Sequence, residues 1–110
     1  MSYPLRVVIR LYPREEKDFP ARIAVSVSKR RFKRAVKRNR VKRLIRETYR
    51  LNKNILYSYI PEDKTMDILF IYLHDEIFEY GKIEKAITGA IKKIRSYIEK
   101  DSGGDIADTH

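Results

Sequence analysis

Hydrophobic and polar residues alternate along two segments near the start of the chain. In residues 5–12 every second side chain is aliphatic, and residues 22–28 repeat the pattern. Such alternation is typical of a strand with one buried face. A short polar connection bounded by Pro13 and Pro20 separates the two segments. They are therefore predicted to form an antiparallel pair with one apolar face and one polar, cation-bearing face.

The spacing of apolar residues becomes helical from about Ala35 to Asn52. The predicted buried stripe consists of Val41, Leu44, Ile45, Thr48, Leu51 and Asn52. The opposite side carries Asn39, Lys42, Arg43, Arg46, Arg50 and Lys53 at i, i+3/i+4 spacing. The pattern predicts an amphipathic helix whose exposed side is almost purely cationic. Residues 55–60 either extend this helix or form a short packed turn.

The second half of the chain predicts one more strand and one more helix. Residues 66–73 are apolar on nearly both faces, as in a central strand covered on both sides. Residues 82–99 carry a regular apolar stripe and predict a helix packed on the sheet. The element order favours an α/β (α+β) two-layer sandwich in one domain, residues 1–101. Residues 102–110 are expected to form a flexible tail after Gly103 and Gly104.

Charge changes this picture because it is concentrated in one segment. Residues 29–53 hold 13 of the 25 Lys and Arg residues and one acid, for a local charge of +12. The whole chain is +10, so the remainder sums to −2. A localised positive field indicates a polyanionic partner, most commonly nucleic acid.

Three interpretations of this basic segment remain open. It could be a solvated surface without a partner, or a basic amphipathic helix that binds a membrane surface or a calmodulin-like protein. The core needs its apolar stripe, which favours nucleic acid instead. Strands on both sides of the helix argue against a helix-turn-helix reader of DNA. Phosphate-spaced cations on a sheet-packed helix favour folded RNA.

The polar face of the predicted sheet is a second candidate surface. Its members Arg6, Arg10, Tyr12, Arg22, Ser26 and Ser28 combine cations, hydroxyls and an aromatic ring. These groups suit a shallow platform for a single strand of nucleic acid. The alternative is that another segment of the chain simply covers this face.

A protein-based active site has little support in the sequence. His74 is the one histidine next to carboxylates, and its simplest interpretation is the end of a strand. Asp67 on a buried strand is interpreted as a hydrogen-bonded edge residue and not as a metal ligand. The chain has no cysteine, which excludes disulfides and thiolate metal sites and fits a reducing, cytoplasmic location. No metal site is predicted in the protein.

The basic segment resembles the protein subunit of bacterial ribonuclease P. The resemblance lies in the Arg-Asn-Arg core at 38–40, the Lys-Arg at 42–43 and the Arg-Glu at 46–47. The strand and turn at 22–33 resemble the family too, whereas residues 66–73 and the last helix do so more loosely. The resemblance implies a left-handed strand–helix–strand crossover around the basic helix. The general rule for such units would predict a right-handed one.

The resemblance also implies a role in tRNA processing. In that family the RNA subunit with bound Mg²⁺ is the catalyst, and it removes the 5′ leader of precursor tRNA. The protein binds that RNA through the basic helix and holds the leader between sheet and helix. By position, the implied RNA contacts are Lys29, Arg30, Lys33, Arg38, Asn39, Arg40, Lys42, Arg43 and Arg46. Arg50, on the exposed side of the predicted helix, is a further candidate. Either Arg38 or Arg40 is instead a candidate to organise the start of the helix, with Arg40 leaning toward the buried side.

One feature departs from the family pattern, because the chain reaches its first strand at once after residues 1–4, without the usual N-terminal helix. An uncovered sheet face would then permit self-association. Two other functions stay open: a ribosomal-type structural RNA-binding module and a metal-dependent protein nuclease that uses His74.

Overall fold

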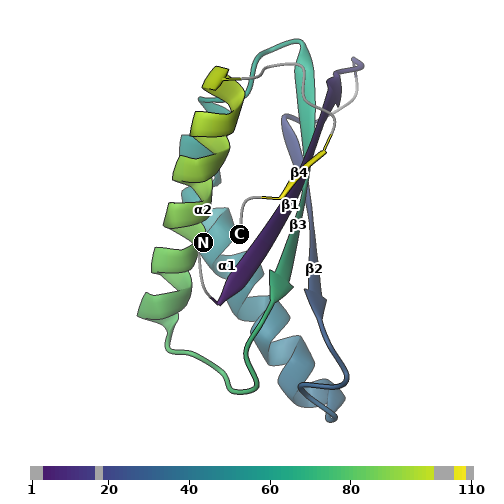
Figure 1. The fold of residues 1–110 in the computed structure, drawn as a ribbon, viewed down its shortest axis with the longest axis vertical. Coiled ribbons are helices and arrows are strands. Elements are labelled where there is room, and N and C mark those ends of the chain that lie inside the picture. The colour runs from purple at the N-terminus through teal and green to yellow at the C-terminus, as the bar shows by residue number, and fades with distance from the viewer. Residues whose placement is uncertain (1–3, 17–18, 101–105, 109–110) are drawn as a thin grey trace.

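A computed structural model describes residues 4–16, 19–100 and 106–108. In chain order the elements are β1 (Leu5–Pro13), β2 (Ala21–Val27), α1 (Ala35–Tyr57), β3 (Lys64–Tyr72), α2 (Tyr80–Lys100) and β4 (Ile106–Asp108). The strands form one mixed sheet in the order β2-β3-β1-β4. Both helices lie on the same side of this sheet and contact each other (Figure 1). This is the predicted two-layer α+β sandwich.

The two N-terminal strands are not neighbours, so the predicted β1–β2 pair is wrong. β3 lies between them, antiparallel to β1 and parallel to β2. Alternation in a sequence specifies which side chains share a face, but not which strands share an edge. Leu69 and Ile71 make β3 apolar even on its helix-free side, which suits the central position of the sheet.

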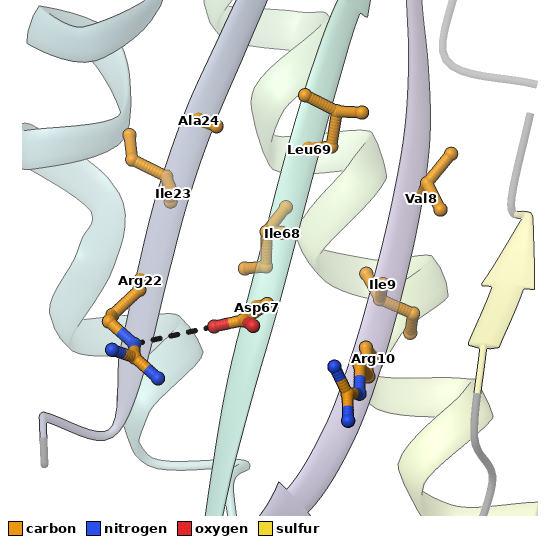
Figure 2. A pocket seen from close by; sticks show the side chains of 9 residues that line it. All are labelled: Val8, Ile9, Arg10, Arg22, Ile23, Ala24, Asp67, Ile68 and Leu69. Atoms are coloured by element: carbon orange, nitrogen blue, oxygen red, sulfur yellow. Dashed lines mark ion pairs between the residues drawn. The ribbon is translucent and has the colours of Figure 1, made fainter.

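The connection from β2 through α1 to β3 is a left-handed crossover. In Figure 2 the helix-free face is toward the viewer, and Arg22 to Ala24 on β2 and Asp67 to Leu69 on β3 both run upward. β3 lies to the right of β2 while α1 passes behind the sheet. Most parallel strand–helix–strand units have the opposite hand. The handedness expected from the family resemblance is therefore present.

The core lies between the helices and one face of the sheet. Leu5, Ile45, Leu56 and Met66 are completely buried there. β3 is covered by helices on this side only, so the prediction of cover on both sides is wrong. On the helix-free side Asp67, for example, is half-buried. Neighbouring side chains of β1 and β2 shield this side of β3 laterally, which an apolar run cannot distinguish from cover by a second layer.

The buried stripe of α1 is rotated relative to the predicted stripe, of which Leu44 and Asn52 are only half-buried. Tyr49 is buried with Val41 and Ile45, whereas Leu51 is 58% exposed. Tyr49 follows Ile45 by four residues and precedes Leu56 by seven, so the three lie on one side of the helix. Leu51 is two residues from Tyr49 and points to the other side. The sequence allows a stripe through Leu51 or a stripe through Tyr49. The contacts of α1 with α2 and β2 bury the stripe that contains Tyr49.

The structure also describes the end of α1 and part of the C-terminal segment. Residues 55–57 extend α1, which ends before Ser58, and the chain then turns into β3. Ile106–Asp108 pairs antiparallel with β1 as β4, where the sequence predicts only a flexible tail. The outer edge of β1 has backbone groups that need hydrogen-bond partners, and β4 supplies them. The rest of the predicted tail lies outside the described residues.

Within the described residues, neither helix has the length and apolar character that crossing a membrane requires.

Candidate nucleic-acid interface

The start of α1 is fixed by a compact turn that follows β2. The backbone amides of Arg31 and Phe32 both donate to the carbonyl of Ser28. Phe32 is buried, and its ring packs against Tyr72 with 6.0 Å between centroids. The basic segment is therefore anchored to the core before the helix begins.

Arg38 organises the first turn of α1. Its guanidinium donates to the carbonyls of Phe32 at 2.8 Å and Lys33 at 3.1 Å. The N-cap residue Arg34 makes no side-chain capping hydrogen bond, so Arg38 provides the link between turn and helix. Of the two candidates for this role, Arg38 is the one that fills it. Arg40 is exposed instead of leaning toward the core.

Replacing Arg38 by alanine is expected to lower the free energy of unfolding by about 1–2 kcal/mol, because two carbonyls lose a charged donor. Urea unfolding of the free protein measures the change. Lys37→Ala is the matched control, because Lys37 is an exposed neighbour on the same turn and its loss should shift stability by less than ~0.5 kcal/mol. Equal unfolding midpoints for the two variants would contradict a structural role for Arg38.

One side of α1 forms a shallow cationic hollow, which we call the cationic face. It is lined by Asn39, Lys42, Arg43, Arg46, Glu47 and Arg50. Glu47 is its one acid, and Arg50 donates to its carboxylate at 2.5 Å. This hydrogen bond, together with the charge of Arg50, holds the pKa of Glu47 below its usual value. Glu47 is thus already paired within the helix, and the net field of the face is positive.

The other residues predicted to contact RNA have different surroundings. Arg40 lines a neighbouring hollow with Leu44 and Tyr80. Lys29, Arg30 and Lys33 are exposed before α1 begins. The structure therefore brings Asn39, Lys42, Arg43, Arg46 and Arg50 together in one hollow with Arg40 next to it, whereas Arg38 is directed back to the turn.

The helix-free side of the sheet, which we call the open sheet face, carries a row of charged residues across three strands. Arg10 on β1 is opposite Asp67 on β3, which is opposite Arg22 on β2. The Arg22 Nε lies 3.4 Å from the Asp67 carboxylate (Figure 2). Asp67 is hydrogen-bonded as expected, by the hydroxyl of Tyr12, but it lies on a central strand and not at an edge. Its carboxylate compensates part of the charge of the two flanking arginines.

Tyr12 completes this cluster. Its hydroxyl donates to Asp67 at 2.9 Å and accepts a hydrogen bond from the guanidinium of Arg22. The guanidinium groups of Arg10 and Arg22 lie 5.4 and 5.7 Å from the centre of its ring. Cation–π attraction operates over such distances. The hydrogen bonds and ring contacts hold one aromatic ring and two cations in fixed positions on the open sheet face.

A hollow of about 520 Å³ lies on the open sheet face beside this cluster. Figure 2 shows its lining from three strands, with Val8, Ala24 and Leu69 beyond the charged row. Arg6 and Ser26, also predicted to contact a single strand, oppose Ile71 in a second row. The apolar part of this hollow was not among the predicted site residues. The sequence did contain a sign of it, because Val8 and Ala24 are apolar residues at positions on the otherwise polar face of the predicted strands.

His74 lies just after the end of β3. Its ring packs on Phe78 with 4.4 Å between centroids. Among the described residues no three His, Cys, Asp or Glu side chains are grouped so that they could hold a metal ion.

The fold and these two surfaces define a class: a small α+β protein with a cationic helix face and a polar, aromatic-bearing sheet face. A family described as Ribonuclease P matches residues 5–95. The chain belongs to this family of ribonuclease P proteins.

Individual relatives agree with this assignment. A ribonuclease P protein component from Porphyromonas gingivalis is 44% identical over 93 residues, which is 84% of this chain and 67% of the relative. One from Clostridium botulinum is 38% identical over 99 residues, covering 87% of this chain and 81% of the relative. One from Chlorobaculum tepidum is 60% identical over 44 residues, or 40% of this chain and 29% of the relative. No solved structure gives a significant match.

Proposed function

We propose that this chain is a protein component of ribonuclease P that binds the catalytic RNA subunit and assists removal of the 5′ leader from precursor tRNA. The observation that carries the proposal is the family match over residues 5–95, which includes the entire cationic face. Catalysis belongs to the RNA subunit and its Mg²⁺, and the protein contributes binding. The result is a mature tRNA 5′ end.

The cationic face is the proposed contact with the RNA subunit. Lys42, Arg43 and Arg46 are spaced along one side of a helix whose other side is anchored in the core. The helix backbone holds these cations at a fixed spacing, so they can bind successive phosphates without further ordering of the backbone. Their electrostatic role is to offset repulsion between the phosphates of the RNA subunit and of the substrate.

The open sheet face is the proposed site for the leader of precursor tRNA. Arg10 and Arg22 offer charge for its phosphates, and the Tyr12 ring offers a surface on which an unpaired base can stack. The adjacent apolar hollow is long enough to involve three strands. A site of this kind favours precursor tRNA over mature tRNA, because only the precursor has a leader to place there.

Reconstitution tests this function directly. The RNA subunit alone and the RNA subunit with this chain are compared for cleavage of precursor tRNA at low Mg²⁺ concentration. We expect cleavage only, or much faster, with the protein present, because its cations replace part of the charge screening that Mg²⁺ provides. Equal rates with and without the protein would favour the alternative of a structural RNA-binding module. Cleavage by the protein alone, abolished in His74→Ala, would favour a protein nuclease.

The leader site makes a separate prediction. Tyr12→Ala should weaken binding of precursor tRNA by the reconstituted complex about 5- to 150-fold, because base–aromatic stacking is worth ~1–3 kcal/mol. Binding of mature tRNA should not change. Phe19→Ala is the matched control, since Phe19 is an exposed aromatic residue in the connection between β1 and β2. A parallel loss of precursor and mature tRNA binding would contradict the assignment of Tyr12 to the leader.

A further inference from the structure

A second hollow lies next to the cationic face, where α1 meets the segment between β3 and α2. It is lined by Arg40, Leu44, Ile77, Phe78, Glu79 and Tyr80. Leu44, Ile77 and Phe78 are half-buried, so they form an apolar wall. Tyr80 is 40% exposed and Arg40 is exposed as well. We call this site the Tyr80 hollow.

The Tyr80 hollow is continuous with the cationic face. An intermediate depression is lined by Arg40, Arg43, Leu44, Glu47 and Tyr80. It shares Arg43 and Glu47 with the cationic face and the remaining three with the Tyr80 hollow. Tyr80 lines this depression together with Arg43 and Glu47, so its side chain lies next to the cationic face. A path therefore leads from cations to an apolar, aromatic site.

Charge orients a nucleotide along this path. Lys42, Arg43 and Arg46 attract phosphate at one end. At the other end Arg40 and Glu79 carry opposite charges, and Lys82 Nζ lies 5.1 Å from the centre of the Phe78 ring. Positive charge is therefore weaker there than on the cationic face, so phosphate is attracted less strongly and an uncharged base is tolerated. Tyrosine rings and arginine guanidinium groups both stack on unpaired bases. The path therefore matches a nucleotide with its phosphate on the cationic face and its base beside Tyr80.

We infer that the Tyr80 hollow binds an unpaired nucleobase of the ribonuclease P RNA, stacked on Tyr80 against the apolar wall. This inference rests on the proposed function of the cationic face and adds the kind of RNA structure that it recognises. A base can reach the hollow only when it is extruded from a bulge, loop or strand end. A uniform duplex keeps its bases paired and offers only phosphates to the neighbouring cations.

The test measures affinity for the RNA subunit as a function of salt concentration with Tyr80→Leu, which keeps apolar bulk but removes the aromatic ring. We expect affinity to fall about 5- to 150-fold with the slope of log affinity against log salt unchanged, because stacking releases no counterions. Tyr80→Phe should bind like the unchanged protein. Phe19→Leu, an exposed aromatic residue elsewhere, is the control and should also bind normally.

The outcomes separate this inference from the proposed function. If Lys42→Ala with Arg43→Ala lowers affinity and slope while Tyr80→Leu does neither, the cationic face binds RNA and the Tyr80 hollow does not. If neither variant changes binding, the proposed function of the face fails too. A Tyr80→Leu variant that lowers the slope would assign Tyr80 to phosphate contacts and overturn base stacking. A loss of affinity in Tyr80→Phe equal to that in Tyr80→Leu would do the same, since it would assign the effect to the hydroxyl.

Discussion

Replacing Arg43 and Arg46 together by alanine should weaken binding of the RNA subunit roughly 100-fold at low salt. Both side chains are exposed on the cationic face, so their loss leaves the core intact. Two charge-assisted hydrogen bonds contribute ~1.5 kcal/mol each at the lower end of their range, and ~1.4 kcal/mol is a factor of ten. Filter binding over a series of salt concentrations measures the effect.

The salt dependence is the more specific part of this result. Each lost phosphate contact should lower the slope of log affinity against log salt by about 0.7–0.9, so the double variant should lose between one and two units. Lys85→Ala with Lys92→Ala is the matched control, because both lysines are exposed on α2. Each double variant lowers the net charge from +10 to +8. An equal loss of slope in both would mean that total charge, and not the cationic face, determines binding.

Ile45→Ala should lower the free energy of unfolding by about 2–5 kcal/mol, the largest change in stability that we predict. Ile45 has no exposed surface and lies where α1 faces the sheet and α2. Shortening such a side chain loses its burial and leaves a cavity between elements that cannot fully close around it. Small domains have only about 5–15 kcal/mol of stability in total, so the variant should be close to unfolding.

The same substitution at Ile55 provides the control, because Ile55 is on the same helix but 51% exposed. We expect Ile55→Ala to cost less than ~1 kcal/mol, since little apolar surface leaves water at this position on folding. Urea unfolding of both variants gives the comparison. RNA binding should then recover for Ile45→Ala at high RNA concentration, because a ligand of the folded state stabilises it by mass action. Similar unfolding midpoints for the two variants would contradict the burial that distinguishes them.

The local pattern of residues was sufficient to predict most helices and strands and the cationic face. Strands β1 and β2, and the start of α1 at Ala35, follow from spacing alone. Lys42, Arg43 and Arg46 were predicted to share a side because positions three or four apart on a helix are neighbours. These properties depend on a few consecutive residues, which is why they can be read without knowing the fold.

Other features of the site depend on residues far apart in the sequence. Asp67 was interpreted as a hydrogen-bonded edge residue without a named partner, and it is paired with Arg22 and Tyr12 because β3 lies between β1 and β2. Tyr80 was not among the predicted site residues, and only the packing of the start of α2 against α1 brings it beside Arg43. No local spacing encodes which distant segments become neighbours.

By itself, the sequence determined the class of fold, the amphipathic character of α1 and the concentration of charge on one of its sides, since these follow from periodicity and composition. Its motif also indicated the family and, through it, the left-handed crossover. Only the tertiary structure decided the strand order, the choice of Tyr49 over Leu51 for the core, and the assembly of the Tyr12–Arg22–Asp67 cluster and the Tyr80 hollow. The physical reason is that burial and hydrogen bonding between distant segments are settled by how all the elements pack together.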